Sequence, residues 1–128
     1  MRLYITELIY MISGIQPEYG DLPTNTDFPA ISIAFRGTQE DNICKDMMMH
    51  AYTITCYSKR PKGAFNVRGY QELETMVYQI LNHLSSSALS SHGGCVVEAI
   101  SAGEHYVHAN QALACDIQLL CRWMYAPT

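Results

Sequence analysis

Two stretches of the chain carry hydrophobic residues at steps of three and four, the spacing of one face of a helix. The first covers residues 2–12 and ends at Ser13-Gly14. The second covers residues 66–84, and its apolar stripe comprises Val67, Tyr70, Leu73, Val77, Ile80, Leu81 and Leu84. The opposite side of that stretch is polar, with Arg68, Gln71, Glu72, Glu74 and Gln79. The pattern predicts a short N-terminal helix and one long amphipathic helix.

Other stretches alternate in character at every second residue, which is the spacing of a β-strand. They are residues 30–35, 47–57, 95–101 and 112–125. In the last stretch one face is apolar from Leu113 to Tyr125, whereas the other mixes apolar and polar residues. A mixed face is typical of a sheet that a helix or a neighbouring subunit covers only in part.

The segments between these elements read as loops and turns. Residues 14–29 form a loop, residues 37–46 an acidic loop or the tip of a long hairpin, and residues 103–110 a turn. The order therefore predicts an α+β fold: a mainly antiparallel four-stranded sheet, one long helix packed across it and a short N-terminal helix. With 128 residues and neither repeats nor a linker, we expect a single domain over residues 1–128.

Charged residues are scarce, at 16% of the chain against about 25% in typical domains. One interpretation is a neutral surface rich in Ser, Thr, Gln and Asn. The other, which we favour, is that part of the exterior is covered by partner subunits. The net charge of −4 disfavours a protein that grips nucleic acid, although a mildly acidic lining would suit a ring through which DNA passes.

The five cysteines are odd in number and show no CxxC spacing, which favours buried, reduced thiols and assembly in a cytoplasm. Cys115 and Cys121 lie on one predicted strand, too far apart to pair with each other. The apolar N-terminal run is interrupted by Thr6 and Glu7 and has no convincing cleavage site, so a signal peptide is disfavoured. No apolar run is long enough to span a membrane.

Catalytic and metal-binding patterns are weak. Glu104, His105 and His108 are the best metal candidates, but residues three apart in a strand point to opposite faces. Ser91-His92-Gly93-Gly94 lacks the strand–turn–helix setting of a nucleophile elbow, and no phosphate-binding glycine motif occurs. The sequence thus predicts no active site, no cofactor and no metal.

Two local concentrations suggest contact surfaces instead. Lys59, Arg60 and Lys62 form a basic turn, with Arg68 close behind. It is either a solvated turn, or a contact for an acidic neighbour or for phosphate in a channel. Met47 and Met48 begin a methionine run that would suit a flexible interface or ordinary strand packing.

A longer pattern covers residues 22–125. The string Asp27-Phe28-Pro29-Ala30-Ile31-Ser32-Ile33 enters the first strand, and an acidic loop through Asp46 follows. The alternating strand 50–57, the amphipathic helix, the segment 97–106 and a closing strand ending at Tyr125 complete it. This order resembles the tail terminator proteins of long-tailed bacteriophages of the lambda type, within a broader group of tail-completion and neck proteins. The basic turn and the five cysteines depart from that pattern.

The resemblance implies a virion structural protein, assembled in the host cytoplasm, and not an enzyme. Its partners would be itself, in a homo-hexameric ring, the tail tube protein and the head–tail connector, with DNA passing through the lumen. We hypothesise that Glu40, Asp41 and Asp46 reach toward the tube or the lumen. With Met47, Met48, Lys59, Arg60 and Lys62, they are the expected interface residues.

Three alternatives remain open from the sequence. A tail-completion or head–tail joining protein of the neck would share the fold. A small metal-dependent hydrolase would use His105, His108 and Glu104. A free-standing bacterial interaction domain would be a monomer.

Overall fold

The computed structural model describes residues 2–20, 22, 27–40, 47–59, 68–85, 95–108 and 112–124. Within them the elements follow in the order α1 (Arg2–Ser13), β1 (Glu18–Tyr19), β2 (Ala30–Glu40), β3 (Met47–Ser58), α2 (Arg68–Ser85), β4 (Cys95–Ala102), β5 (Tyr106–Val107) and β6 (Leu113–Met124). Both predicted helices and all predicted long strands are present. The strand predicted over residues 30–35 is longer than expected, because β2 continues to Glu40.

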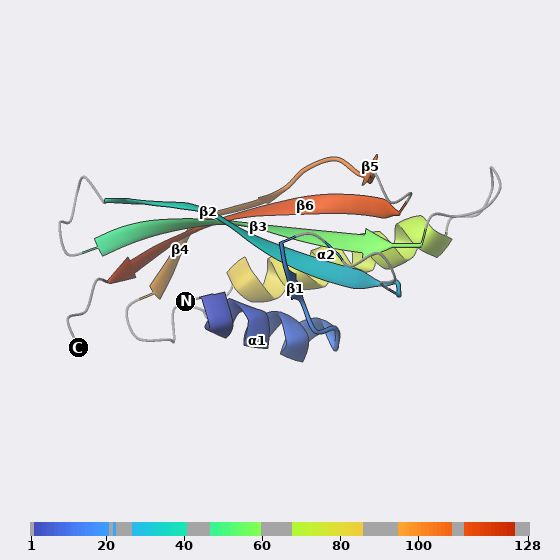
Figure 1. Ribbon diagram of the computed structural model, residues 1–128, viewed down its shortest axis with the longest axis horizontal. Helices are drawn as coiled ribbons and strands as arrows, with labels where there is room; N and C mark the ends of the chain where they lie inside the picture. Colours follow the sequence, from blue (N-terminus) through green and yellow to red (C-terminus); the bar gives the residue numbers. More distant parts are fainter. Residues whose placement is uncertain are drawn as a thin grey trace.

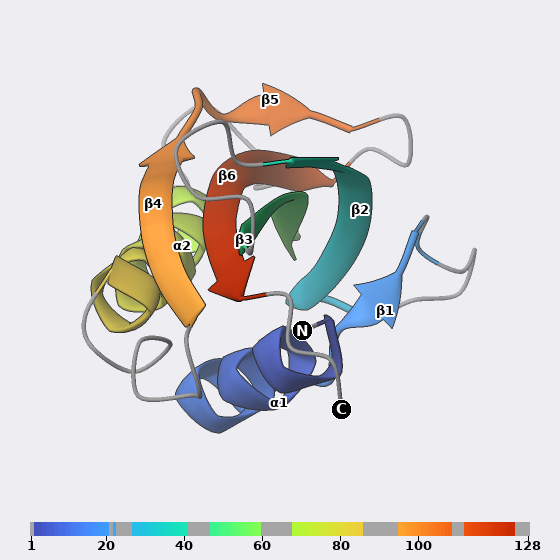
Figure 2. The same cartoon turned by 90° about the vertical axis from the view of Figure 1, so that its left-hand side faces the viewer.

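The strands form one six-stranded open sheet in the order β1-β2-β3-β6-β4, with β5 also paired to β6. Only β1 and β2 run parallel, and every other neighbouring pair is antiparallel. Figure 1 shows α1 and α2 on the same face of the sheet, and Figure 2 shows how strongly the strands curve. The fold is therefore a two-layer α+β arrangement whose other sheet face carries no described helix.

The prediction of four strands was wrong, because the described residues already form a sheet of six. The additional strands, β1 and β5, are two residues each, too short to show any alternation. β5 lies on the same edge of β6 as β4, so the predicted turn over residues 103–110 contains a continuation of that edge. Between them the amide of Gly103 donates to the carbonyl of Asp116 at 2.9 Å, which keeps the two strands in line.

The main core lies between the sheet and the helices. Ile54 of β3 and Ile117 of β6 are cross-strand partners at its centre, and both are fully buried. Leu73 and Ile80 of α2 reach the same cluster, as does Ile9 of α1. Burying one such side chain contributes about 1.5–3 kcal/mol, so this apolar layer is what fixes the helices to the sheet.

Two residues of α2 differ from the predicted apolar stripe. Tyr70 is 43% exposed, whereas Met76, which the stripe omitted, is only 5% exposed. Residues 73, 76, 77, 80 and 84 form the buried face of α2 that packs on the sheet, and Tyr70 does not belong to it. A tyrosine tolerates this position because its hydroxyl can remain in water.

The described cysteines behave as small apolar residues. Cys56, Cys115 and Cys121 are buried, as the sequence predicted. Cys56 and Cys115 are cross-strand partners on the helix side of the sheet, and burial raises the pKa of the Cys56 thiol well above its usual value. Burial also raises the pKa of the Cys115 thiol, so Cys56 and Cys115 stay protonated at neutral pH.

Candidate interaction surface

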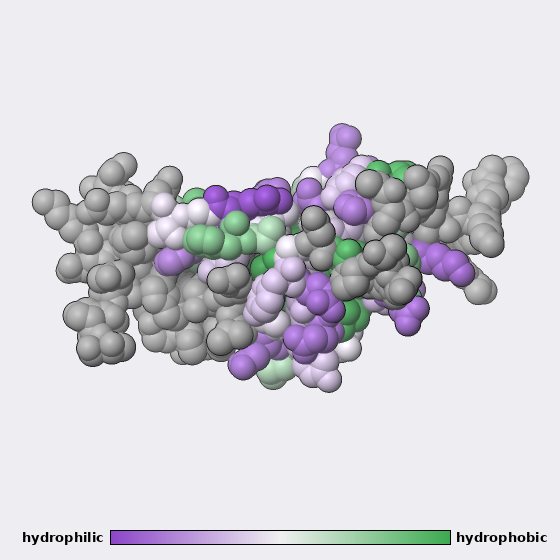
Figure 3. Space-filling model, viewed as in Figure 1, coloured by the Kyte–Doolittle hydropathy of each residue, from purple (hydrophilic) through white to green (hydrophobic). Residues whose placement is uncertain are grey.

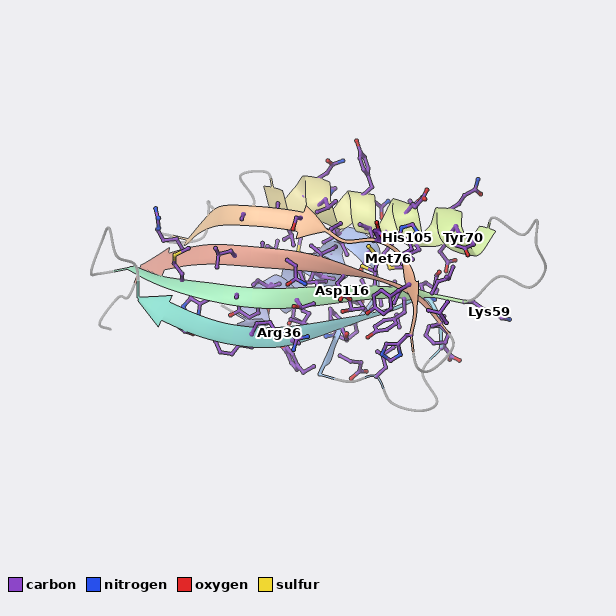
Figure 4. The ribbon with its side chains drawn as sticks, turned by 90° about the horizontal axis from the view of Figure 1, so that it is seen from above. Arg36, Lys59, Tyr70, Met76, His105 and Asp116 are labelled. Atoms are coloured by element: carbon purple, nitrogen blue, oxygen red, sulfur yellow. The ribbon has the colours of Figure 1, made fainter. Side chains whose placement is uncertain are left out.

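The face of the sheet opposite α1 and α2, here called the helix-free face, is crossed by a line of hydrogen-bonded side chains. The Nε of Arg36 on β2 donates to the hydroxyl of Thr53 on β3 at 3.0 Å. That hydroxyl donates in turn to the amide oxygen of Gln118 on β6, also at 3.0 Å. Three strands are thus connected by side chains as well as by backbone ladders. Figure 4 looks onto the sheet from above and labels Arg36 and Asp116.

A second line of contacts converges on Asp116. Its Oδ1 accepts a hydrogen bond from Thr55 of β3 at 2.9 Å and one from the Tyr106 hydroxyl of β5 at 2.8 Å. Burial, followed by the hydrogen bond to Asp116, raises the pKa of Tyr106 above its usual value. Thr53 and Thr55 are buried although no described helix covers this face. Their hydroxyls are satisfied within the sheet, so the helix-free face stays ordered without further cover.

One end of the helix-free face is closed by the chain itself. Ala30, Tyr57, Ala112 and Ala114 form a small buried cluster there, and Leu22 and Phe28, of the segment that enters β2, pack against it. The ring of His108 meets that of Tyr57 edge-on at 5.2 Å, and the Tyr57 hydroxyl lies 3.2 Å from that of Ser32. This end of the face is therefore less available to a partner than the end near Arg36.

The other end of the face carries a shallow hollow of about 200 Å³. It is lined by Met49, Ala51 and Leu120 together with Arg36, Gly37 and Thr38. Arg36 is exposed and occupies a bulge, because the register of β2 against β3 shifts between Phe35 and Gly37. A bulge re-aims the side chain it carries. Figure 3 shows hydrophilic residues interspersed with smaller hydrophobic patches over the described surface in that view.

The residues expected at an interface are only partly placed. Glu40 and Met48 are cross-strand partners near the end of the β2–β3 hairpin, next to Met47. Lys59 follows β3 and is exposed (Figure 4). Asp41, Asp46, Arg60 and Lys62 lie outside the described residues. The structure thus tests neither the acidic hypothesis nor the basic turn as a whole.

The histidines considered for a metal site point in different directions. The His105 ring lies 6.3 Å from the ring of Tyr70 on α2, whereas His108 lies against Tyr57 on the helix-free face. Figure 4 shows His105 beside Tyr70. Glu104 is exposed. Within the described residues, no three His, Cys, Asp or Glu side chains are grouped so that they could hold a metal ion.

Arg36, Tyr106 and the bonds to Asp116 were not anticipated as site features. The available signal was weak: Thr53 and Thr55 alternate with apolar residues in β3, which indicates a polar second face. Their partners lie more than 60 positions away on β6, and sequence alone does not give that register. No described helix is long and apolar enough to cross a membrane.

Comparisons with known proteins add no relative. Neither a protein-family model nor a curated protein matches the chain.

Proposed function

We propose that this chain is a structural protein of a bacteriophage virion, a tail terminator that forms a ring at the head-proximal end of the tail tube. The ring would stop tube growth, present a joining surface to the head connector and let DNA pass. The observation that supports this most is the helix-free face. It is a long sheet surface on which the side chains of Thr53, Thr55 and Gln118 are hydrogen-bonded within the sheet, yet no described helix covers it.

Such a face suits repeated protein–protein contact. Its hydroxyls and amides are held by neighbours within the sheet, so a partner need not satisfy them when it docks. The low share of charged residues reduces the cost of removing water from the surface. A ring requires heterologous contacts, in which one patch of a subunit meets a different patch of the next. A sheet face and a helix layer on opposite sides of one subunit provide two such different patches.

A tail-completion or head–tail joining role in the neck is the second candidate, because the same features serve any ring in that region. The metal-hydrolase alternative gains no support from geometry, since His105 and His108 lie against different aromatic rings on opposite faces of the sheet. The alternative of a monomeric interaction domain is distinguished from a ring protein by the electron microscopy described next.

The test is electron microscopy of the purified chain over a range of concentrations, with and without purified tail tubes of its phage. Annular particles, or rings seated on the head-proximal ends of tubes, are expected. Rings that contact only the connector would favour the neck role. A chain that stays monomeric and never binds tubes or connectors would overturn the proposal.

A further inference from the structure

The helix layer carries a hollow larger than the one beside Arg36. It has a volume of about 420 Å³ and lies between α2 and the segment that follows α1. Apolar atoms of Ile15, Pro29 and Met76 contribute to its wall, and the polar side chains at its rim include Gln71, Glu72 and Gln79 of α2. We call it the Glu72 groove. Figure 4 labels Met76, which lies on the helix side of the sheet.

The chemistry of the Glu72 groove suits a cation on an apolar stem. Glu72 is exposed and makes no hydrogen bond or ion pair with another described residue. Its carboxylate can accept two parallel hydrogen bonds from one guanidinium. The amide oxygens of Gln71 and Gln79 add acceptors at the rim, and the apolar wall suits the methylene stem of arginine.

Arg36 has the complementary properties. Only its Nε is engaged, with Thr53, so its terminal nitrogens donate no hydrogen bond to another described residue. The bulge at Arg36 places this side chain on the exposed, open end of the helix-free face. We propose that Arg36 of one copy of this chain docks in the Glu72 groove of the next copy. This contact rests on the proposed ring and assigns its subunit interface.

The positions of the two partners exclude a contact within one molecule. Arg36 is on the helix-free face, whereas the Glu72 groove is lined by residues of α2 and of segments next to it, including Met76 behind the sheet (Figure 4). Each copy therefore offers its guanidinium to one neighbour and its groove to another. Such a head-to-tail contact gives a ring when the rotation closes, and a filament when it does not.

Charge reversal tests the contact, read by sedimentation velocity over a concentration series. Arg36→Glu and Glu72→Arg should each raise the concentration of half-assembly at least tenfold, because like charges then face each other. The double variant should recover assembly, and so should an equimolar mixture of the two single variants, since every contact in it can pair opposite charges. Glu72 is exposed, so the thermal unfolding of Glu72→Arg should match that of the wild type. Arg36→Glu also loses the hydrogen bond to Thr53, so its unfolding is measured beside its assembly, and the mixture with Glu72→Arg must restore assembly.

Matched controls are Glu74→Arg, on α2 but outside the groove lining, and Glu7→Arg, at an exposed position of α1 that is also outside the lining. Both should assemble like the wild type. Three results would overturn this contact. The single reversals could leave assembly unchanged, the double variant could assemble no better than either single variant, or the wild type could stay monomeric at the highest concentration. None of these bears on tube binding, which the microscopy above tests separately. Conversely, charge-dependent rings that ignore tails would retain the contact and overturn the proposed function.

Discussion

Asp116 shows how much one side chain contributes to this sheet. Its Oδ1 receives hydroxyls from β3 and β5, while its carbonyl oxygen receives the amide of Gly103 between β4 and β5. Asp116 therefore connects β6 to β3 and β5 through its side chain, and to the segment between β4 and β5 through its backbone. The alternation along β6 predicted that Asp116 faces away from the core, which the structure confirms. The partners were not predictable, because they depend on the register of distant strands.

Tyr106 gives a prediction about pH. Its pKa is raised in the folded protein, first by burial and then by the hydrogen bond to Asp116, so folding favours the neutral phenol. The resulting stability is fully present below the ordinary tyrosine pKa of about 10 and is lost as the pH rises above it. Tyr106→Phe should lower the free energy of unfolding by about 1 kcal/mol at pH 8. The deficit should shrink above pH 10.

Urea denaturation between pH 8 and 11 measures this difference. The other tyrosines are present in both proteins, so their ionisation cancels when the variant is compared with the wild type. A deficit that stays constant across the range would show that the Tyr106–Asp116 bond does not govern the shift.

At the scale of elements, the helices were the most predictable parts. Residues 73, 77, 80 and 84 are buried at helical spacing as the pattern indicated, because a long helix on a sheet must present one continuous apolar face. Strand positions were also predictable, since Tyr52, Ile54 and Cys56 of β3 all face the core. β1 and β5 were not, because two-residue strands are defined by their neighbours and not by their own composition.

The contrast between two α2 positions follows from this packing. Leu73 is fully buried, whereas Tyr78 is 66% exposed on the same helix. Leu73→Ala should lower the free energy of unfolding by about 2–5 kcal/mol, since it opens a cavity between helix and sheet. Tyr78→Ala should change it by about 0.5 kcal/mol or less. Chemical denaturation of both variants checks the pair, and equal losses would mean that α2 does not pack as described.

At the scale of the whole molecule, the sequence predicted the layers but not the strand order. Nothing in the pattern says that β6 lies between β3 and β4, or that β1 joins the sheet in parallel. The hollow beside Arg36 and the Glu72 groove depend on that arrangement, because each combines residues from separate segments. Surfaces of this kind become visible only when the chain is folded.

The acidic segment of the β2–β3 hairpin yields a prediction at this scale. If Glu40, Asp41 and Asp46 face the tube or the lumen, reversing all three to lysine should impair docking on tail tubes or retain DNA in the ring. Subunit assembly should persist, since the proposed contact uses Arg36 and Glu72 and none of the three reversed residues. Tube co-sedimentation and DNA release from assembled particles are the measurements. Unchanged docking and unchanged DNA passage would contradict the hypothesis.

The central place of β6 has a consequence for biosynthesis. β6 pairs with β3, β4 and β5, yet it follows all of them in the chain. During synthesis from the amino end, β3 and β4 each have an unpaired edge until β6 has left the ribosome. The pairing of β6 with them joins segments that are far apart in the sequence. Nascent chains therefore lack a complete sheet until translation has passed β6, and in that interval the unpaired edges of β3 and β4 can pair with other chains.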